Sequence, residues 1–111
     1  MSTNAFTPLG NTIAFIANVS GSVPNPVQAV SSTLGGNQYR IINSGTVTVF
    51  LGIGNTSSNA SNNAIVVTTT GPSYPLLPGT DEILTFGPNW YFTGITASGT
   101  ATVYITPGDG L

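Results

Sequence analysis

The stretch Tyr39-Arg-Ile-Ile-Asn-Ser-Gly-Thr-Val-Thr-Val-Phe-Leu-Gly-Ile-Gly54 carries the clearest signal for the fold of this chain. Its Val, Ile, Thr, Tyr and Phe residues are those that suit a pleated, half-buried strand. The residues of Thr46–Leu51 alternate, so Val47, Val49 and Leu51 share one face while Thr46, Thr48 and Phe50 share the other. Between the apolar segments, Asn43-Ser44-Gly45 predicts a hairpin joining strands at Arg40–Ile42 and Val47–Leu51, with Gly as the left-handed residue.

The rest of the chain repeats this pattern of short strands and turns. Ala97-Ser98-Gly99 predicts a second hairpin, between Trp90–Thr96 and Thr100–Thr106. In Thr100–Thr106, the residues Ala101, Val103 and Ile105 form one face and the Thr and Tyr residues form the other. With 14 Gly and 8 Pro, little room is left for a helix of normal length. The expected strands are Thr12–Val19, Val27–Ser31, Gln38–Asn43, Thr46–Ile53, Ala64–Thr69, Glu82–Phe86, Trp90–Thr96 and Thr100–Thr106.

Eight short strands in 111 residues predict an all-β, single-domain antiparallel sandwich of the jelly-roll type, with an immunoglobulin-like sandwich as the alternative. We expect residues 1–10 to form an N-terminal arm and residues 11–111 to form the sandwich domain. The polar stretch Gly54–Asn63 is either a long surface loop or one short helical turn around Ser57–Asn63.

Charged side chains are almost absent from the chain. There is one cation, Arg40, there are three acids, and there is no Lys, His or Cys. Charged residues make up 4% of the chain, against about 25% in an average soluble domain. The missing side chains exclude zinc sites, thiolate chemistry and disulfides, and one Arg cannot neutralise a nucleic-acid backbone. Such a weakly charged surface costs little to desolvate, which suits a subunit that is docked in an assembly.

The three acids offer little chemistry. Neighbours on a strand point to opposite faces, so Asp81 and Glu82 cannot flank one bond as a glycosidase pair does. We expect Asp81 to cap a turn after Pro78-Gly79 and Glu82 to begin a strand. A calcium site from Asp81 and Asp109 has no EF-hand spacing to support it. We therefore expect no catalytic residue, no cofactor and no metal.

Arg40 and an aromatic segment are the candidates for contact residues. Arg40 either binds a ligand or a neighbouring subunit, or forms a structural ion pair with Glu82, Asp81 or Asp109. Trp90-Tyr91-Phe92, with Tyr74, is either a mixture of core and interface rings or a sugar-binding platform. The N-terminus has no secretory signal pattern and the apolar runs are too short for a membrane helix, so we expect synthesis in the cytoplasm of the producing cell and no membrane partner.

The segment from Tyr39 to Gly54 resembles small virion proteins of tailed bacteriophages, in which a strand ending in Asn-x-Gly turns into a second strand with a Gly-rich end. The runs Leu77-Pro-Gly-Thr-Asp-Glu-Ile-Leu-Thr-Phe86 and Ala97-Ser-Gly-Thr-Ala-Thr-Val-Tyr-Ile-Thr-Pro-Gly108 add to this resemblance. Together these segments cover roughly the C-terminal two-thirds of the chain. The resemblance is to the capsid decoration, or cement, type of virion protein.

That resemblance implies a non-enzymatic β-sandwich, synthesised in the host cytoplasm, that trimerises and binds the major capsid protein on the outer surface of the head. The residues expected at its interfaces are Phe6, Leu9, Arg40, Trp90 and Tyr91, with residues 1–10 reaching a neighbour. The alternative function is a head-fibre or tail recognition module that binds host glycans through Trp90, Tyr91 and the Gly54–Asn63 loop. A hydrolase is the third reading, and the absence of His and Lys argues against it.

Overall fold

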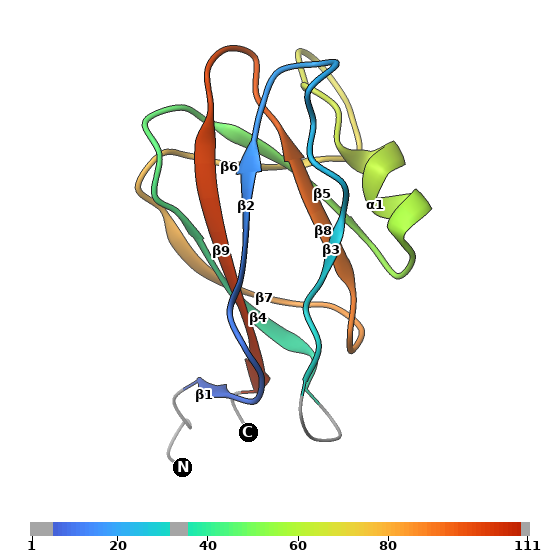
Figure 1. Cartoon of the computed structure of the whole chain (residues 1–111), viewed down its shortest axis with the longest axis vertical. Helices are drawn as coiled ribbons and strands as arrows, with labels where there is room; N and C mark the ends of the chain where they lie inside the picture. Colours follow the sequence, from blue (N-terminus) through green and yellow to red (C-terminus); the bar gives the residue numbers. More distant parts are fainter. Residues whose placement is uncertain (1–5, 32–35, 110–111) are drawn as a thin grey trace.

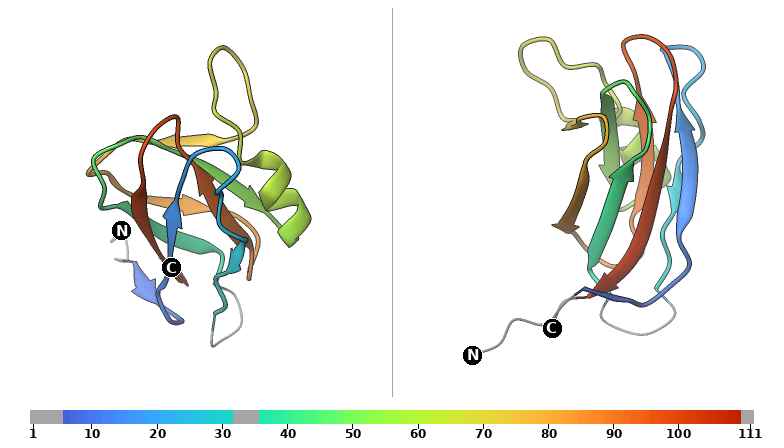
Figure 2. Two further views of the ribbon diagram at one scale, coloured as in Figure 1. Left: turned by 45° about the horizontal axis from the view of Figure 1, so that its top comes forward. Right: turned by 90° about the vertical axis from the view of Figure 1, so that its left-hand side faces the viewer.

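Two antiparallel sheets packed face to face, with one short helix, form the structure (Figure 1), a computed structural model that describes residues 6–31 and 36–109. The five-stranded sheet contains β1 (Thr7–Pro8), β2 (Ile13–Ala17), β9 (Ala101–Asp109), β4 (Gln38–Asn43) and β7 (Asp81–Thr85). The four-stranded sheet contains β3 (Val27–Gln28), β8 (Tyr91–Ile95), β5 (Val49–Gly54) and β6 (Tyr74–Leu76). Figure 2 shows the two sheets as separate layers. The predicted all-β sandwich is confirmed.

The strand pairs are nested, because the first half of the chain pairs in order with the second half. The antiparallel pairs are β2 with β9, β3 with β8, β4 with β7, and β5 with β6. Further pairing of β4 with β9 and of β5 with β8 joins these ladders into the sheet orders β2-β9-β4-β7 and β3-β8-β5-β6. A nested double hairpin rolled into two sheets is the jelly-roll arrangement. It differs from the immunoglobulin-like order, which was the alternative.

Both predicted hairpins are wrong. β4 and β5 lie in different sheets, so the turn at residues 43–45 crosses the sandwich and does not pair its flanking strands. The same holds for β8 and β9 on either side of residues 97–99. Both turns lie at the upper end of the molecule in Figure 1. A short Gly-containing turn joins adjacent strands equally well whether the second strand stays in its sheet or enters the facing one, so turn chemistry alone does not separate the two cases.

The core lies between the two sheets and is built from the predicted alternation. Val49 and Leu51 of β5 are fully buried, as are Val103 and Ile105 of β9 in the opposite sheet. Full burial of such a side chain contributes about 1.5–3 kcal/mol. Larger rings complete the core, since Tyr39 packs edge-on against Phe92 with ring centroids 4.9 Å apart. The row Ala101, Val103 and Ile105 faces the core as predicted, and so do Val49 and Leu51, whereas residues 46–48 lie before β5 and Val47 is only partly buried.

The helix α1 (Ser57–Asn63) lies on the outer side of the four-stranded sheet, against β5 and β8. Thr56 caps its N-terminus by accepting a hydrogen bond from the backbone N–H of Asn59 at 3.1 Å. A Cβ on Gly52 would lie 2.3 Å from the carbonyl oxygen of Ala60, so Gly52 allows the helix to approach the strand closely. Of the two readings of the Gly54–Asn63 stretch, the short helix is confirmed.

Two differences concern strands. The predicted strand Ala64–Thr69 is wrong, because these residues pair with no strand and follow α1 as an irregular segment. The strands β1 and β6 were not predicted, since each is very short and contains a Pro. A Pro in a strand fits the edge of a sheet, where these two strands lie. Within residues 6–31 and 36–109, no helix has the length and apolar character needed to span a membrane.

Candidate functional site: a groove on the five-stranded sheet

The charged residues of the chain all lie in one sheet. Arg40 is on β4, Asp81 and Glu82 are on β7, and Asp109 ends β9, so all four belong to the five-stranded sheet. The four-stranded sheet, α1 and the loops that join the strands contain no charged side chain. The two sheets therefore differ sharply in what their outer faces can bind.

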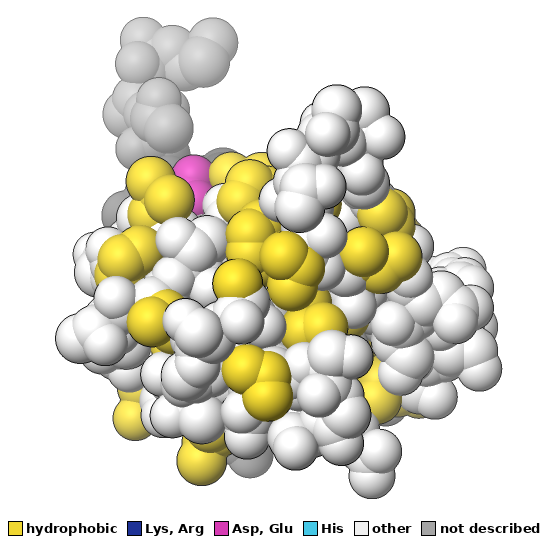
Figure 3. Space-filling model, turned by 90° about the horizontal axis from the view of Figure 1, so that it is seen from above, with side chains coloured by type: hydrophobic (Ala, Val, Ile, Leu, Met, Phe, Trp, Pro, Cys, Tyr) yellow, Lys and Arg dark blue, Asp and Glu magenta, His cyan; other side chains and the backbone are white. Residues whose placement is uncertain are grey.

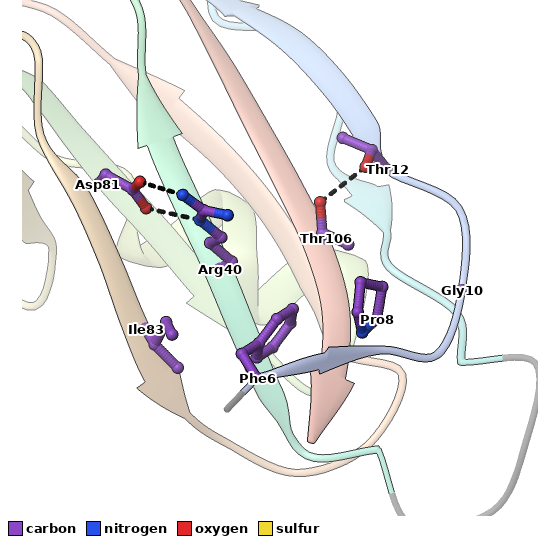
Figure 4. A pocket seen from close by; sticks show the side chains of 8 residues that line it. All are labelled: Phe6, Pro8, Gly10, Thr12, Arg40, Asp81, Ile83 and Thr106. Atoms are coloured by element: carbon purple, nitrogen blue, oxygen red, sulfur yellow. Dashed lines mark hydrogen bonds and ion pairs between the residues drawn. The ribbon is translucent and has the colours of Figure 1, made fainter. Parts of the chain in front are cut away.

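A groove of about 740 Å³ opens on the outer face of the five-stranded sheet, where the N-terminal segment crosses the end of β9 (Figure 4). Its lining comes from that segment and from β4, β7 and β9. The residues are Phe6, Pro8, Gly10, Thr12, Arg40, Asp81, Ile83 and Thr106.

Strand register places the floor of the groove. Arg40 is the cross-strand partner of Thr106 on one side and of Ile83 on the other, so the three side chains form a row across the sheet. This row points outward because the alternate residues Tyr39 and Ile41 are fully buried. The sequence singled out Arg40 as the only cation, but it did not reveal which strands neighbour β4, and for that reason Ile83 and Thr106 were missed.

Arg40 and Asp81 form a two-point ion pair at the centre of the groove. Arg40 Nε donates to Asp81 Oδ1 at 2.9 Å, and Nη2 donates to Oδ2 at 2.5 Å. The two side chains are 49% and 43% exposed, so the pair faces solvent. Of the three partners expected for Arg40, the structure selects Asp81. The expected turn cap at Asp81 is wrong, because Asp81 is the first residue of β7 and its carboxylate is engaged by Arg40.

The ion pair keeps both groups charged. The hydrogen bond from Arg40, aided by its charge, holds the pKa of Asp81 below its usual value, against a smaller opposing effect of desolvation. The same hydrogen bond and the charge of Asp81 raise the pKa of Arg40. The groove consequently contains fixed donors and acceptors but no net charge.

The N-terminal segment forms one wall of the groove. Thr7 and Pro8 pair with Asp109 and Gly108, and the backbone N–H of Leu9 donates to the carbonyl oxygen of Pro107 at 2.9 Å. A Cβ on Gly108 would lie 2.4 Å from Cζ of Phe6, so the Phe6 ring lies directly over this glycine. Residues 7 and 8 thus belong to the sheet of this domain, while residues 1–5 of the expected arm lie outside the described residues.

Two threonines join the N-terminal segment to the floor of the groove. The hydroxyl groups of Thr12 and Thr106 lie 2.7 Å apart in a hydrogen bond between the β9 face and the segment before β2. In Figure 4 this pair and the Arg40–Asp81 pair lie on different strands of the same face. Thr12 also was missed, because the sequence predicted it as the first residue of a strand but gave no signal that this strand would pair with β9.

The five expected interface residues separate into two groups. Phe6 and Arg40 line the same groove, and Leu9 lines an adjoining hollow of about 470 Å³ with Pro8, Gly10, Asn11 and Val30. Trp90 and Tyr91 line neither. The interface role of all five remains a prediction.

The aromatic segment is largely structural. Phe92 is fully buried, and half-buried Trp90 stacks on Phe86 with centroids 5.4 Å apart and planes 19° apart. The backbone N–H of Trp90 donates to the hydroxyl of Tyr39, which donates to the carbonyl oxygen of Gly87 at 2.6 Å. Burial raises the pKa of Tyr39. The expected core role of these rings holds for Phe92, and Trp90 packs against that core.

A second acid, Glu82, joins the two sheets. Glu82 accepts a hydrogen bond from the hydroxyl of Tyr74 on β6 at 3.0 Å, which raises the pKa of Tyr74. Asp81 and Glu82 thus point to different partners on different sides of β7, as predicted. Among residues 6–31 and 36–109, no group of three or more acids assembles that could hold a metal ion.

No protein-family model, curated protein or solved structure matches this chain. The chemistry of its surface is therefore the basis for a functional proposal.

Proposed function

We propose that this chain is a non-enzymatic structural protein of a tailed-bacteriophage virion, of the capsid decoration type. In this role it binds the outer capsid surface through the major capsid protein, assembles with copies of itself as a homotrimer, and stabilises the head. The observation that carries the proposal is the division of charge between the sheets. One whole side of the jelly roll, the four-stranded sheet with α1, has no charged side chain.

An uncharged protein surface suits permanent docking. Burying a charge costs several kcal/mol unless it is paired, whereas neutral hydroxyl and amide groups exchange hydrogen bonds with a partner at little cost. The exposed residues of α1 are Ser and Asn, which offer such exchangeable groups. Many copies on one head would make modest contacts cumulative.

The loop end of the molecule has the same character. Figure 3 looks down on this end and shows apolar side chains in small groups among neutral ones, with one acidic side chain in view and no basic one. Leu77, in the loop between β6 and β7, is 59% exposed. Depletion of charge with scattered apolar groups is typical of the central part of protein interfaces.

The jelly roll itself is compatible with the proposal, since viral capsid domains and lectins both use it. The alternative, glycan recognition through Trp90, Tyr91 and the Gly54–Asn63 loop, needs an exposed aromatic cluster. Trp90 stacks on Phe86, and residues 57–63 form α1 on the sheet. The structure therefore offers less support for that alternative than for docking.

Localisation in the virion is the first test. Antibody raised against the purified chain would be applied to particles of the phage that encodes it, followed by gold labelling and electron microscopy. We expect label over the head surface. Label on the tail, or none on the particle, would overturn the proposal.

A pair of lysine variants tests the docking side. Ser58→Lys places a charge on the exposed side of α1, and Thr85→Lys places the same charge on an exposed position of β7. We expect Ser58→Lys to weaken cosedimentation with heads lacking the protein by about tenfold or more, because the buried charge finds no partner. Thr85→Lys is the matched control and should bind normally. The reverse order would place the contact on the five-stranded sheet.

A further inference from the structure

We propose that the groove at the N-terminal segment is a binding site for a neutral saccharide. Arg40 and Asp81 would supply its hydrogen-bonding element, and Phe6 its apolar wall. The volume of about 740 Å³ lies within the range of roughly 300–1,000 Å³ that is usual for small-molecule sites.

The ion pair between Arg40 and Asp81 is the strongest reason to propose a saccharide as the ligand. Arg40 uses Nε and Nη2 on Asp81, which leaves the N–H groups of Nη1 to donate to a ligand. Each oxygen of Asp81 accepts one of these bonds and retains a further lone pair. A donor and an acceptor are thus held side by side in a fixed plane, and both groups are about half exposed. Two neighbouring hydroxyl groups of a sugar ring fit this arrangement, because each can donate and accept.

The charge balance selects the class of ligand. A phosphate or carboxylate attracted by Arg40 would be repelled by Asp81, which lies in direct contact with it. A cation attracted by Asp81 would meet the guanidinium in the same way. Since the pKa values of both groups are shifted in favour of the charged forms, this balance persists across the neutral range. A neutral polyhydroxylated molecule is the ligand that gains from both groups.

The other sides of the groove match the apolar face of a sugar ring. Phe6 projects from the N-terminal segment over the end of β9, and Ile83, 49% exposed, projects from β7 next to Arg40 in the row across the sheet (Figure 4). Aromatic and aliphatic side chains pack against the C–H groups of sugars by burying apolar surface. The hydroxyl pair of Thr12 and Thr106 adds neutral donors and acceptors.

This site is separate from the surface that we propose for docking. The groove lies on the outer face of the five-stranded sheet, whereas α1 and the uncharged strands belong to the opposite side. A decoration protein docked by its uncharged side would present the groove to the medium. Saccharide binding is nonetheless measurable on the isolated chain and does not depend on attachment to a head.

The experiment is a nuclear magnetic resonance titration of the ¹⁵N-labelled full chain. The probes are the methyl glycosides of glucose, mannose, galactose and fucose, with sodium sulfate and sodium acetate at matched ionic strength. A single sugar in a shallow groove is expected to bind with a Kd of about 1 mM or weaker. We expect at least one glycoside to shift the amide signals of Arg40, Ile83 and Thr106, and neither anion to do so.

Three variants distinguish the groove from the rest of the surface. Asp81→Asn keeps the size of the side chain but leaves Arg40 unpaired. It should weaken the glycoside by about tenfold and allow sulfate to shift the same amides. Phe6→Ala, outside the core, should also weaken the glycoside. Thr85→Ala, exposed on β7 outside the groove, is the control and should bind as the original chain does.

The proposal is overturned if no glycoside shifts the groove amides, or if sulfate shifts them in the original chain. It is also overturned if the shifts map around Trp90 and Tyr91, since binding would then occur on the other sheet. The amide spectra of the variants show in the same experiment whether each is folded, so a loss of binding cannot be mistaken for unfolding.

Discussion

The two turns that cross between the sheets look alike in the sequence and are held by different forces. The turn at residues 43–45 is held by the fully buried amide of Asn43, whereas the turn at residues 97–99 is held by the hydroxyl of the preceding Thr96 and a left-handed glycine, Gly99. They lie against each other, since a Cβ on Gly45 would meet Ala101 and one on Gly99 would approach Val47. The comparison shows that the sequence of a short Gly-containing turn does not reveal which of its atoms hold the chain as it passes from one sheet to the other.

Asn43 is the centre of the first turn. Its Nδ2 donates to the carbonyl oxygens of Val47 and Leu76 at 3.0 and 2.9 Å, and its Oδ1 accepts from the N–H of Gly45 at 3.0 Å. Its backbone N–H donates to the carbonyl oxygen of Thr80 at 3.0 Å. One side chain thus joins β4, the turn and the end of β6. In the second turn, the hydroxyl of Thr96 makes a single bond, to the carbonyl oxygen of Gly99 at 2.6 Å.

The sharpest test of this difference compares Asn43→Ala with Thr96→Val. The first change leaves two carbonyl groups and one N–H without their partner in a buried site, and each such group costs about 1–3 kcal/mol. We expect Asn43→Ala to lower the free energy of unfolding by about 3–5 kcal/mol, and Thr96→Val by about 1 kcal/mol. Urea denaturation followed by tryptophan fluorescence measures both. Equal losses would mean that the two turns are held alike.

The two glycines provide the next test. Gly45 does not have a positive φ, but a Cβ there would lie 2.4 Å from Cβ of Ala101 and 2.8 Å from its Cα. We expect Gly45→Ala to destabilise the protein by about 2 kcal/mol through overpacking. Adding Ala101→Gly should recover part of this loss in a double-mutant cycle. No recovery would show that the cost lies in the backbone of the turn instead.

Gly99 should respond in the opposite way. Its φ is 74°, and its nearest contact for a Cβ is Val47 Cγ1 at the ordinary distance of 3.8 Å. We expect Gly99→Ala to cost about 1 kcal/mol because of the left-handed conformation, and Gly99→Asn to cost less. Trimming Val47 to Ala should not relieve the cost. Relief by that change would make steric contact, and not φ, the reason for glycine here.

These residues also show how far the sequence could predict the structure. The period of two in Thr46–Leu51 and Thr100–Thr106 identified the core faces, because that period depends only on local backbone geometry. Which strands pair with each other depends on contacts between residues far apart in the sequence. Local patterns do not report those contacts, so both turns were predicted as hairpins. The same limit applies to the groove. Arg40 stood out as the only cation, but Ile83 and Thr106 become its neighbours only through the order β9-β4-β7.

The smallest effect on stability is expected for the exposed ion pair between Arg40 and Asp81, in contrast to the buried hydrogen bonds of Asn43. The carboxylate of Asp81 binds Arg40 at the surface, where solvent screens the attraction and exposed pairs add little stability. The pKa of Asp81 is lowered in the folded state, so its contribution is present above the ordinary Asp pKa of about 3.9. That contribution is lost as the pH falls through the lower folded pKa.

We therefore expect the original chain to melt slightly above Asp81→Asn at neutral pH and low salt, by less than the shift caused by Gly99→Ala. This difference should shrink in strong acid and in high salt, because protonation removes the charge of Asp81 and salt screens it. Scanning calorimetry of both proteins at the two pH values and two salt concentrations measures it. A difference that persists in acid would mean that Asp81 acts through neutral hydrogen bonds, as Asn43 does. The Arg40–Asp81 contact in the groove would then not be the ion pair on which our choice of a neutral ligand rests.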